Sequence, residues 1–261
     1  MFKALLLDLD DTLIKSSRVY DRALEFAAYY LAEKNNLNLK EFFPIVKRKD
    51  TLIRKNFPTV HTRHSRILVY RHALDEVGAK YSLSDLPMAE DIYWEFFDEN
   101  VGVYEGVFEA LKQIREEGVK IGIVSDGDLR GRIRKIEAVG LLPYIDQVFA
   151  SEETIFEKPF AAIFTLALSK LHVQNSETLM VGNNYKNDIQ GAQLVGIRGA
   201  IFDPPEDGHV EGYDDDVAAD FSFSHYSELP AIVLTQTATE LPPIEPVVSA
   251  KSHGGAEISQ K

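Results

Sequence analysis

KALLLDLDDTL, residues 3–13, is an apolar run that ends in acidic residues and a threonine. A continuous apolar run is typical of a strand that is buried on both faces of a parallel sheet. Because side chains alternate along a strand, Asp8 and Asp10 lie on one face of the chain and Leu9 on the other. Two carboxylates this close repel each other unless a cation neutralises them, and oxygen ligands of this kind suit Mg²⁺. The stretch predicts a buried strand with a cation site at its carboxyl end.

Three later apolar runs, at residues 119–124, 178–181 and 199–202, also end in polar or turn residues. Amphipathic helical patterns lie between the runs, at residues 107–117, 129–139 and 160–171, and Gly118 and Gly140 stop the first two. This alternation predicts an α/β fold, a doubly wound parallel sheet. Ligands of such sheets bind outside the carboxyl ends of the strands, so polar residues at those ends are the candidates for chemistry.

Residues 17–100 break this alternation, because they carry helical periodicity and many Tyr, Phe and Arg residues but no convincing strand. We expect a core made of residues 1–15 and 102–230. An all-helical cap, residues 16–101, would then lie above the carboxyl end of the first strand. Residues 231–261 are rich in Pro, Ser, Thr, Gly and Glu, and we expect them to form a disordered tail.

The composition excludes several classes of function. With 41 acidic and 28 basic residues the formal charge is −13, which disfavours binding to nucleic acid or to anionic lipid. The chain has no cysteine and therefore no disulfide, thiolate metal site or cysteine nucleophile. No apolar stretch resembles a secretory signal or reaches the roughly 20 residues of a membrane span. We expect a soluble, cytoplasmic protein; no feature of the sequence indicates its oligomeric state.

Hydroxyl, ammonium and amide groups also occur at the predicted strand ends. Thr12 and Ser125 offer hydroxyl donors for a phosphate oxygen, and Lys158, which precedes a proline, offers a fixed positive charge. Asn183 and Asp188 follow the run at 178–181 and could complete a cation site, with Asp188 opening the next helix.

Two further acidic residues follow Ser125. Asp126 is a candidate for substrate binding, and Asp126 and Asp128 are also explained as caps of the helix that begins there.

Asp8-x-Asp10-x-Thr12, then Ser125, Lys158-Pro159 and Gly182-x₅-Asp188 resemble, in order and interval, the four motifs of the haloacid dehalogenase-like hydrolases. The resemblance covers residues 2–230, and the helical insert resembles the cap that these proteins carry between the first and second motifs. It implies that Asp8 attacks phosphorus and forms an aspartyl-phosphate, while Asp10 protonates the leaving oxygen and later activates water. Thr12 and Ser125 would bind the transferring group, and Lys158 would offset its charge.

The same resemblance implies that Mg²⁺ is bound by Asp8, the backbone carbonyl of Asp10 and the fourth motif, here Asn183 and Asp188. Similar proteins usually have Asp where this chain has Asn183. An amide oxygen can still bind the metal, but losing a negative charge should weaken its affinity, so Asp188 would carry more of the acidic role. The implied function is a magnesium-dependent phosphatase acting on a small phosphorylated metabolite.

Four other functions stay open. A haloacid dehalogenase would use Asp8 against carbon without a metal, and Asp10 argues against it. A sugar-phosphate mutase would keep every core residue, and a phosphonate hydrolase would need a cap lysine, for which Lys15 is the candidate. A binding module without turnover would explain Asn183 but not the pair of Asp8 and Asp10.

The insert also contains a basic cluster that could bind a second anionic group on a substrate or could form a solvated face with ion pairs. Its members are His61, Arg63, His64, Arg66, Arg71 and His72. Sugar phosphates, nucleoside monophosphates and acids the size of phosphoglycolate all remain candidate substrates.

Overall fold

The structure is a computed structural model, and it describes residues 1–205, 210–213 and 217–235. Its described strands form one six-stranded sheet in the order β3-β2-β1-β4-β5-β6, and every pairing in it is parallel. The strands are β1 (Ala4–Leu7), β2 (Lys120–Ser125), β3 (Gln147–Ala150), β4 (Thr178–Gly182), β5 (Arg198–Phe202) and β6 (Phe221–Phe223). The order reverses at β1, which lies between β2 and β4, so the predicted doubly wound sheet is confirmed.

The four predicted apolar runs are the four inner strands, and the two strands that the sequence did not predict lie at the edges. In β3, Gln147 is exposed and Val148 is half-buried, so no continuous apolar run marks the strand. β6 is only three residues long and includes an exposed serine. Edge strands of this length bury too little side chain to leave a clear pattern.

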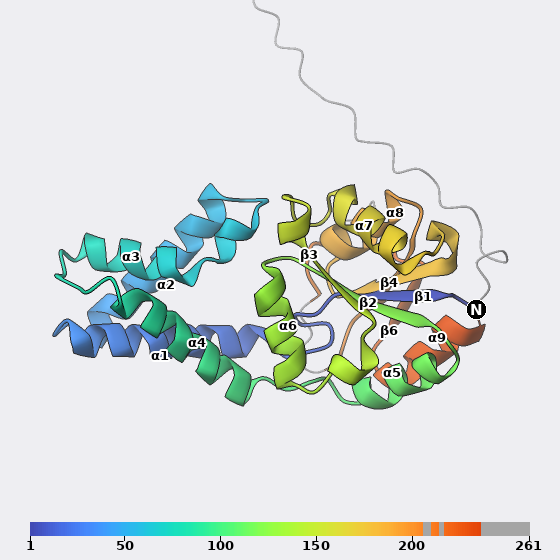
Figure 1. Ribbon diagram of the computed structural model, residues 1–261, viewed down its shortest axis with the longest axis horizontal. Helices are drawn as coiled ribbons and strands as arrows, with labels where there is room; N and C mark the ends of the chain where they lie inside the picture. The colour runs from blue at the N-terminus through green and yellow to red at the C-terminus, as the bar shows by residue number, and fades with distance from the viewer. Residues whose placement is uncertain (206–209, 214–216, 236–261) are drawn as a thin grey trace, which may run out of the picture.

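Helices cover both faces of the sheet (Figure 1). Leu5 and Leu7 of β1 pack in one cluster with α5 (Val107–Glu116), α6 (Leu129–Ala138) and α9 (Leu229–Thr235). Ala4 and Leu6 point the other way and pack with α7 (Ala161–Leu171) and α8 (Gly191–Gln193). This alternation is the period of two that a strand buried on both faces requires.

The predicted ends of two helices are confirmed, whereas the predicted starts of a third helix and of the tail are wrong. Gly118 and Gly140 follow their helices with φ of 79° and 76°, which confirms them as helix stops. Asp188 does not open a helix, because a π-helical segment, η5 (Tyr185–Gln190), begins three residues earlier and Asn184 caps it. The tail cannot begin at residue 231, because α9 continues to Thr235; the rest of the predicted tail, 236–261, lies outside the described residues.

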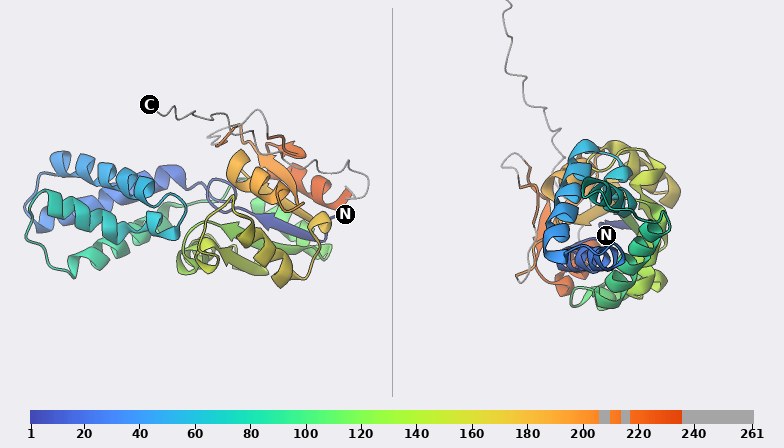
Figure 2. Two further views of the ribbon diagram at one scale, coloured as in Figure 1. Left: turned by 90° about the horizontal axis from the view of Figure 1, so that it is seen from above. Right: turned by 90° about the vertical axis from the view of Figure 1, so that its left-hand side faces the viewer.

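Residues 17–100, called the insert below, contain helices and no strand of the sheet. Its elements are α1 (Ser17–Lys34), α2 (Leu39–Asn56), the short 3₁₀ helix η1 (His61–His64), α3 (Arg66–Glu76) and α4 (Asp85–Asn100). Tyr20 stacks on Phe97 with 4.9 Å between ring centroids, which ties α1 to α4. The insert lies beyond the carboxyl ends of the strands (Figures 1 and 2). No helix in the described part of the chain has the length and apolar character needed to cross a membrane.

Candidate functional site

A cavity of about 290 Å³ lies between the carboxyl ends of the strands and the insert. Residues from four segments that are distant in the sequence line it. They include Asp8, Asp10, Ser125, Lys158, Asn183 and Asp188. The structure therefore brings at least one residue of each sequence motif to a common cleft. Thr12 belongs to the same region but does not line the cavity, because its side chain is fully buried beneath Asp8.

Asp8 extends β1 toward the cavity, and both oxygens of its side chain are held. Its backbone N–H donates to Val181 of β4 at 2.9 Å, which continues the ladder of the sheet past the end of β1. Asp8 Oδ1 accepts a hydrogen bond from Lys158 Nζ at 2.6 Å, and Oδ2 accepts one from Thr12 Oγ1 at 3.1 Å. The orientation of the carboxylate is thus fixed before any ligand arrives.

Lys158 joins two carboxylates in the buried floor of the cavity. Its Nζ lies 2.6 Å from Asp8 Oδ1 and 2.6 Å from Asp188 Oδ1, and it also donates to the carbonyl of Val124 at 3.1 Å. Burial alone would lower the pKa of Lys158, but the carboxylates of Asp188 and Asp8 outweigh burial and raise it. The ammonium group is therefore charged and offsets part of the negative charge around it.

The close approach of Asp188 to β4 depends on Gly182. A Cβ atom at position 182 would lie 2.2 Å from Asp188 Oδ2, which is far inside van der Waals contact. The same oxygen accepts a hydrogen bond from the backbone N–H of Asn184 at 3.0 Å. The glycine of the fourth motif thus makes room for the aspartate six residues later.

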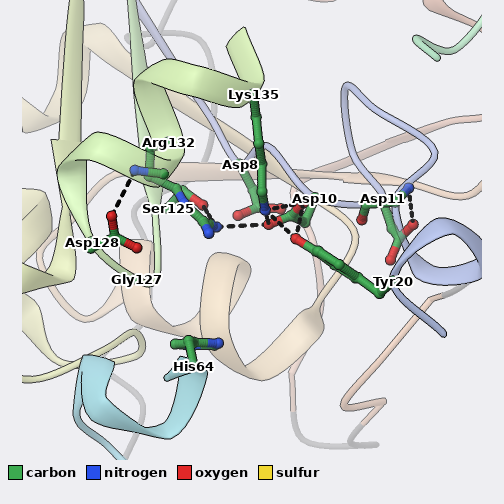
Figure 3. Close-up of polar contacts among 12 residues, drawn as sticks. Asp8, Asp10, Asp11, Tyr20, His64, Ser125, Gly127, Asp128, Arg132 and Lys135 are labelled. Carbon is green, nitrogen blue, oxygen red and sulfur yellow. Dashed lines mark hydrogen bonds and ion pairs between the residues drawn. The ribbon is translucent and has the colours of Figure 1, made fainter. Parts of the chain in front are cut away.

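Asp10 is the most heavily paired carboxylate of the site (Figure 3). Arg132 Nη1 lies 2.8 Å from Oδ2, Lys135 Nζ lies within 2.8 Å of both oxygens, and the Tyr20 hydroxyl donates to Oδ1 at 2.7 Å. Burial would raise the pKa of Asp10, but the charges of Lys135 and Arg132 outweigh it and hold the pKa well below its usual range. Asp10 is therefore ionised in this arrangement.

Arg132, Lys135 and Tyr20 are functional candidates that the sequence did not reveal. Arg132 and Lys135 are three residues apart on α6 and so project from the same face of the helix. Lys135 is fully buried, and burial followed by the charge of Arg132 lowers its pKa to about 7. Arg132 Nη1 also lies 3.3 Å from Ser125 Oγ, so this guanidinium connects two of the sequence motifs.

Asp126 and Asp128 have different structural roles. Asp128 Oδ1 accepts a hydrogen bond from the backbone N–H of Gly131 at 2.7 Å, which confirms it as the N-cap of α6. The capping prediction is wrong for Asp126, whose Oδ1 accepts the backbone N–H of Lys158 at 2.8 Å instead. Burial raises the pKa of Asp126 to about 6. Asp126 lines the cavity and fixes the backbone that carries Lys158.

The oxygen atoms around Asp8 suit a hard cation. Thr12 Oγ1 lies 3.1 Å from Asp8 Oδ2 and 3.3 Å from Asn183 Oδ1, so these two potential ligands converge on the same region. The described residues contain no group of three His, Cys, Asp or Glu side chains that could hold a metal by themselves. A set with two carboxylates, an amide oxygen and a backbone carbonyl, completed by water and phosphate, is the kind that Mg²⁺ accepts.

Comparison with known proteins assigns the family. Residues 2–196, which include all four motifs, match the family model of the haloacid dehalogenase-like hydrolases. The chain belongs to this family. A ribulose-1,5-bisphosphate 5-phosphatase from Halopiger xanaduensis is 31% identical to this hydrolase over 241 residues, which cover 89% of this chain and 100% of that protein. A glyceraldehyde 3-phosphate phosphatase from Methanopyrus kandleri is 29% identical over 89% of this chain and 97% of that protein.

Solved structures confirm the fold of this hydrolase. A HAD phosphatase from Thermococcus onnurineus superposes with a TM-score of 0.67 at 24% identity, covering 89% of this chain and 98% of that one. A 2-haloacid dehalogenase from Pseudomonas syringae pv. tomato superposes with a TM-score of 0.69 at 24% identity, covering 90% and 99%. The same fold is therefore shared by proteins named for two different reactions, and the choice between the reactions depends on the site.

Three of the six residues of the basic cluster line the cavity, and the other three do not. Arg63, His64 and Arg66 line the cavity, together with Arg54, which no sequence motif had indicated. The other three members, His61, Arg71 and His72, are not among the lining residues.

Lys15 and the aromatic residues of α4 differ in their relation to the cavity. Lys15, the candidate for a phosphonate hydrolase, is not among the lining residues either, and its Nζ lies 5.2 Å from the centroid of the Tyr104 ring. Of the aromatic residues of α4, Trp94 reaches the cavity, whereas Tyr93 and Phe97 are fully buried in the insert.

Proposed function

We propose that this hydrolase is a magnesium-dependent phosphatase that transfers the phosphoryl group of a small metabolite to Asp8 and then to water. The observation that carries the proposal is the fixed carboxylate of Asp8, which faces the cavity with Lys158 Nζ 2.6 Å away. A carboxylate that is oriented and charge-compensated in this way is suited to nucleophilic attack. The names of the relatives from Halopiger and Methanopyrus support a sugar phosphate as the substrate.

Each neighbour of Asp8 has a role in the proposed reaction. Asp8 Oδ attacks phosphorus while the bond to the leaving oxygen breaks, and water then attacks the aspartyl-phosphate and releases phosphate. Thr12 keeps the attacking carboxylate oriented through its hydrogen bond to Oδ2. Ser125 donates a hydrogen bond to the phosphoryl oxygens, and Lys158 balances their charge. Mg²⁺, bound through Asp8, the Asp10 carbonyl, Asn183 and Asp188, would supply charge neutralisation and in-line alignment.

Asp10 is proposed to give a proton to the leaving oxygen and to take one from the attacking water. It must carry a proton for the first of these steps, whereas its ion pairs with Arg132 and Lys135 keep it ionised. We infer that an entering phosphoryl group draws the Arg132 guanidinium, which already contacts Ser125, away from Asp10. Lys135 Nζ, which lies 2.7 Å from Asp10 Oδ2, would then pass a proton to Asp10 and so form the acid when substrate is present.

Hydrolysis of p-nitrophenyl phosphate, measured after removal of metals and again after addition of Mg²⁺, tests the proposal. We expect turnover that depends on Mg²⁺ and that the Asp8→Asn variant lacks. Asp75→Asn, which changes an exposed carboxylate of the insert, is the matched control and should keep parental activity. The proposal fails if no phosphorylated substrate is hydrolysed with any divalent metal, or if the protein releases halide from 2-chloropropionate without a metal.

A further inference from the structure

The two sides of the cavity differ in charge. Every Asp and Glu among its described lining residues belongs to the core, and none belongs to the insert. The insert instead contributes four basic residues, which we call the basic wall. These are Arg54, Arg63, His64 and Arg66. Neither Asp8 nor the residues that orient it requires this wall, so the proposed phosphoryl transfer leaves it unexplained.

Contacts with the loop that carries Lys158 hold two residues of the basic wall in place. Glu157 immediately precedes Lys158, and its carboxylate accepts from His64 Nε2 at 2.7 Å and from Arg63 Nη1 at 3.2 Å. The backbone N–H of Glu157 also donates to the carbonyl of Thr59 at 2.9 Å. The segment that carries Arg63 and His64 is therefore attached to the loop that carries Lys158. Figure 3 shows His64 on the insert and Ser125 and Arg132 on the core, with the cavity between them.

The guanidinium groups of the cavity have more hydrogen-bonding capacity than their partners use. Arg54 and Arg66 share one carboxylate, Asp50, at 2.8 Å and 2.9 Å, so this pair of arginines keeps a net positive charge. In the described part of the chain, the Nε atoms of Arg63, Arg66 and Arg132 are buried and have no hydrogen-bond partner. Buried donors without a partner are costly, so the contacts within the protein leave these three guanidinium groups incompletely satisfied.

His64 supports the view that these arginines converge. Its pKa lies well below the usual range, first because the ring is buried and then because of the charges of the surrounding guanidinium groups. These belong to Arg132, Arg54, Arg66 and Arg63. Arginines from both the core and the insert therefore act on the same part of the cavity, which favours an anion there.

We propose that the basic wall binds a second phosphoryl group of the substrate, and hence that the substrates are small metabolites carrying two phosphates. This inference rests on the proposed function, because the first phosphate must be at Asp8. A phosphate offers three oxygens and up to two negative charges to several guanidinium groups, whereas a carboxylate offers two oxygens and one charge. One phosphate would be hydrolysed at the core side while the other is held at the insert side.

Binding to the Asp8→Asn variant, which should not turn substrate over, provides the test. Isothermal titration calorimetry in Mg²⁺ would compare ribulose 1,5-bisphosphate with ribulose 5-phosphate and fructose 1,6-bisphosphate with fructose 6-phosphate. Since hydrogen bonds to charged groups are strong, we expect the bisphosphate of at least one pair to bind about tenfold or more tightly. Adding Arg54→Gln and Arg63→Gln should remove most of that preference. Arg71→Gln, which changes an exposed arginine of the insert, should leave it unchanged.

Three results would overturn the inference: no preference for either bisphosphate, a preference that survives the double arginine change, or equal affinity for 2-phosphoglycolate and the bisphosphates. Turnover by the parent protein separates this failure from failure of the proposed function. Binding preference without hydrolysis of any phosphate ester would refute the phosphatase and leave the second site standing. Hydrolysis of monophosphates without any preference for bisphosphates would support the phosphatase and refute the second phosphate site.

Discussion

Lys158 compensates the negative charges of two buried carboxylates in the site. Asp8 and Asp188 are both buried, and two negative charges in the same buried place would repel each other without a compensating charge. The ammonium group lies 2.6 Å from an oxygen of each. Removing one member of such a buried group usually leaves the remaining charges uncompensated, which costs more than the pairing contributes. The arrangement of Asp8 and Asp188 in the cavity therefore depends on Lys158.

Gly182→Ala should disrupt the same arrangement through a steric effect. The new Cβ would lie 2.2 Å from Asp188 Oδ2, so the aspartate would have to leave its place beside Lys158. We expect loss of phosphatase activity and a decrease of about 1–3 kcal/mol in the free energy of unfolding, measured in urea. Gly102→Ala is the control, because a Cβ there meets no atom within 4 Å. Equal activity and stability of the two variants would show that Asp188 does not need this position.

Asn183→Asp should strengthen the binding of Mg²⁺. The side-chain oxygen of Asn183 converges with Asp8 Oδ2 around Thr12 Oγ1, and a carboxylate there would add a negative charge to the oxygen set. We expect calorimetry to give a lower dissociation constant for Mg²⁺ and thermal unfolding to show a larger stabilisation by Mg²⁺. If the variant binds Mg²⁺ no better than the parent, the cation does not lie beside residue 183.

The candidates read from the sequence share one property, which is that each follows an apolar run or lies within a short motif. Asp8, Ser125 and Asn183 were identified for this reason, and the structure brings them to one cavity. The partners of Asp10 could not be found in this way. Arg132 and Lys135 reach it across 122 and 125 residues, and a charged residue on a helix is more often solvated than buried.

The position of α6 determines what Asp10 contacts, because Arg132 and Lys135 both project from this helix. Its start is fixed by Asp128, which accepts the backbone N–H of Gly131. Asp128→Ala should therefore lower the free energy of unfolding by about 1 kcal/mol. Asp128→Asn should keep both cap and stability, because an amide oxygen also accepts this hydrogen bond. Urea unfolding of the two variants tests the assignment, and equal losses would contradict it.

Strands could be predicted from the sequence where their side chains are buried on both faces of the sheet, because burial requires a run of apolar residues. β1, β2, β4 and β5 lie inside the sheet, so their apolar runs identified them. β3 and β6 lie at its edges, and their pairing with β2 and β5 depends on backbone hydrogen bonds that no side-chain pattern records. The π-helical segment Tyr185–Gln190 was also missed, because it begins three residues before Asp188 and its N-cap is Asn184.

The contacts between core and insert include two that flank the cavity and that come from residues far apart in the sequence. On one side, Tyr20 of α1 donates to Asp10, and on the other, Arg63 and His64 contact Glu157. Between these contacts lies the cavity. The relation between insert and core therefore determines both the environment of Asp10 and the distance from Asp8 to the basic wall.

Glu157→Gln should loosen the second contact. The amide has no charge to pair with Arg63 and accepts a weaker hydrogen bond from His64. We expect a larger radius of gyration by small-angle X-ray scattering and reduced phosphatase activity. Glu25→Gln, an exposed change on α1, should alter neither quantity. An unchanged radius together with full activity would show that Glu157 does not hold the insert in position.

Chemical trapping of the intermediate addresses the role of Asp8. The protein would be mixed with Mg²⁺ and a hydrolysed phosphate ester, quenched in acid and reduced with borohydride, which converts an aspartyl-phosphate to homoserine. Peptide mass spectrometry should then find homoserine at position 8 in the parent protein and none in Asp8→Asn. Homoserine at another aspartate, or turnover without any modified residue, would contradict the assignment of Asp8 as the nucleophile.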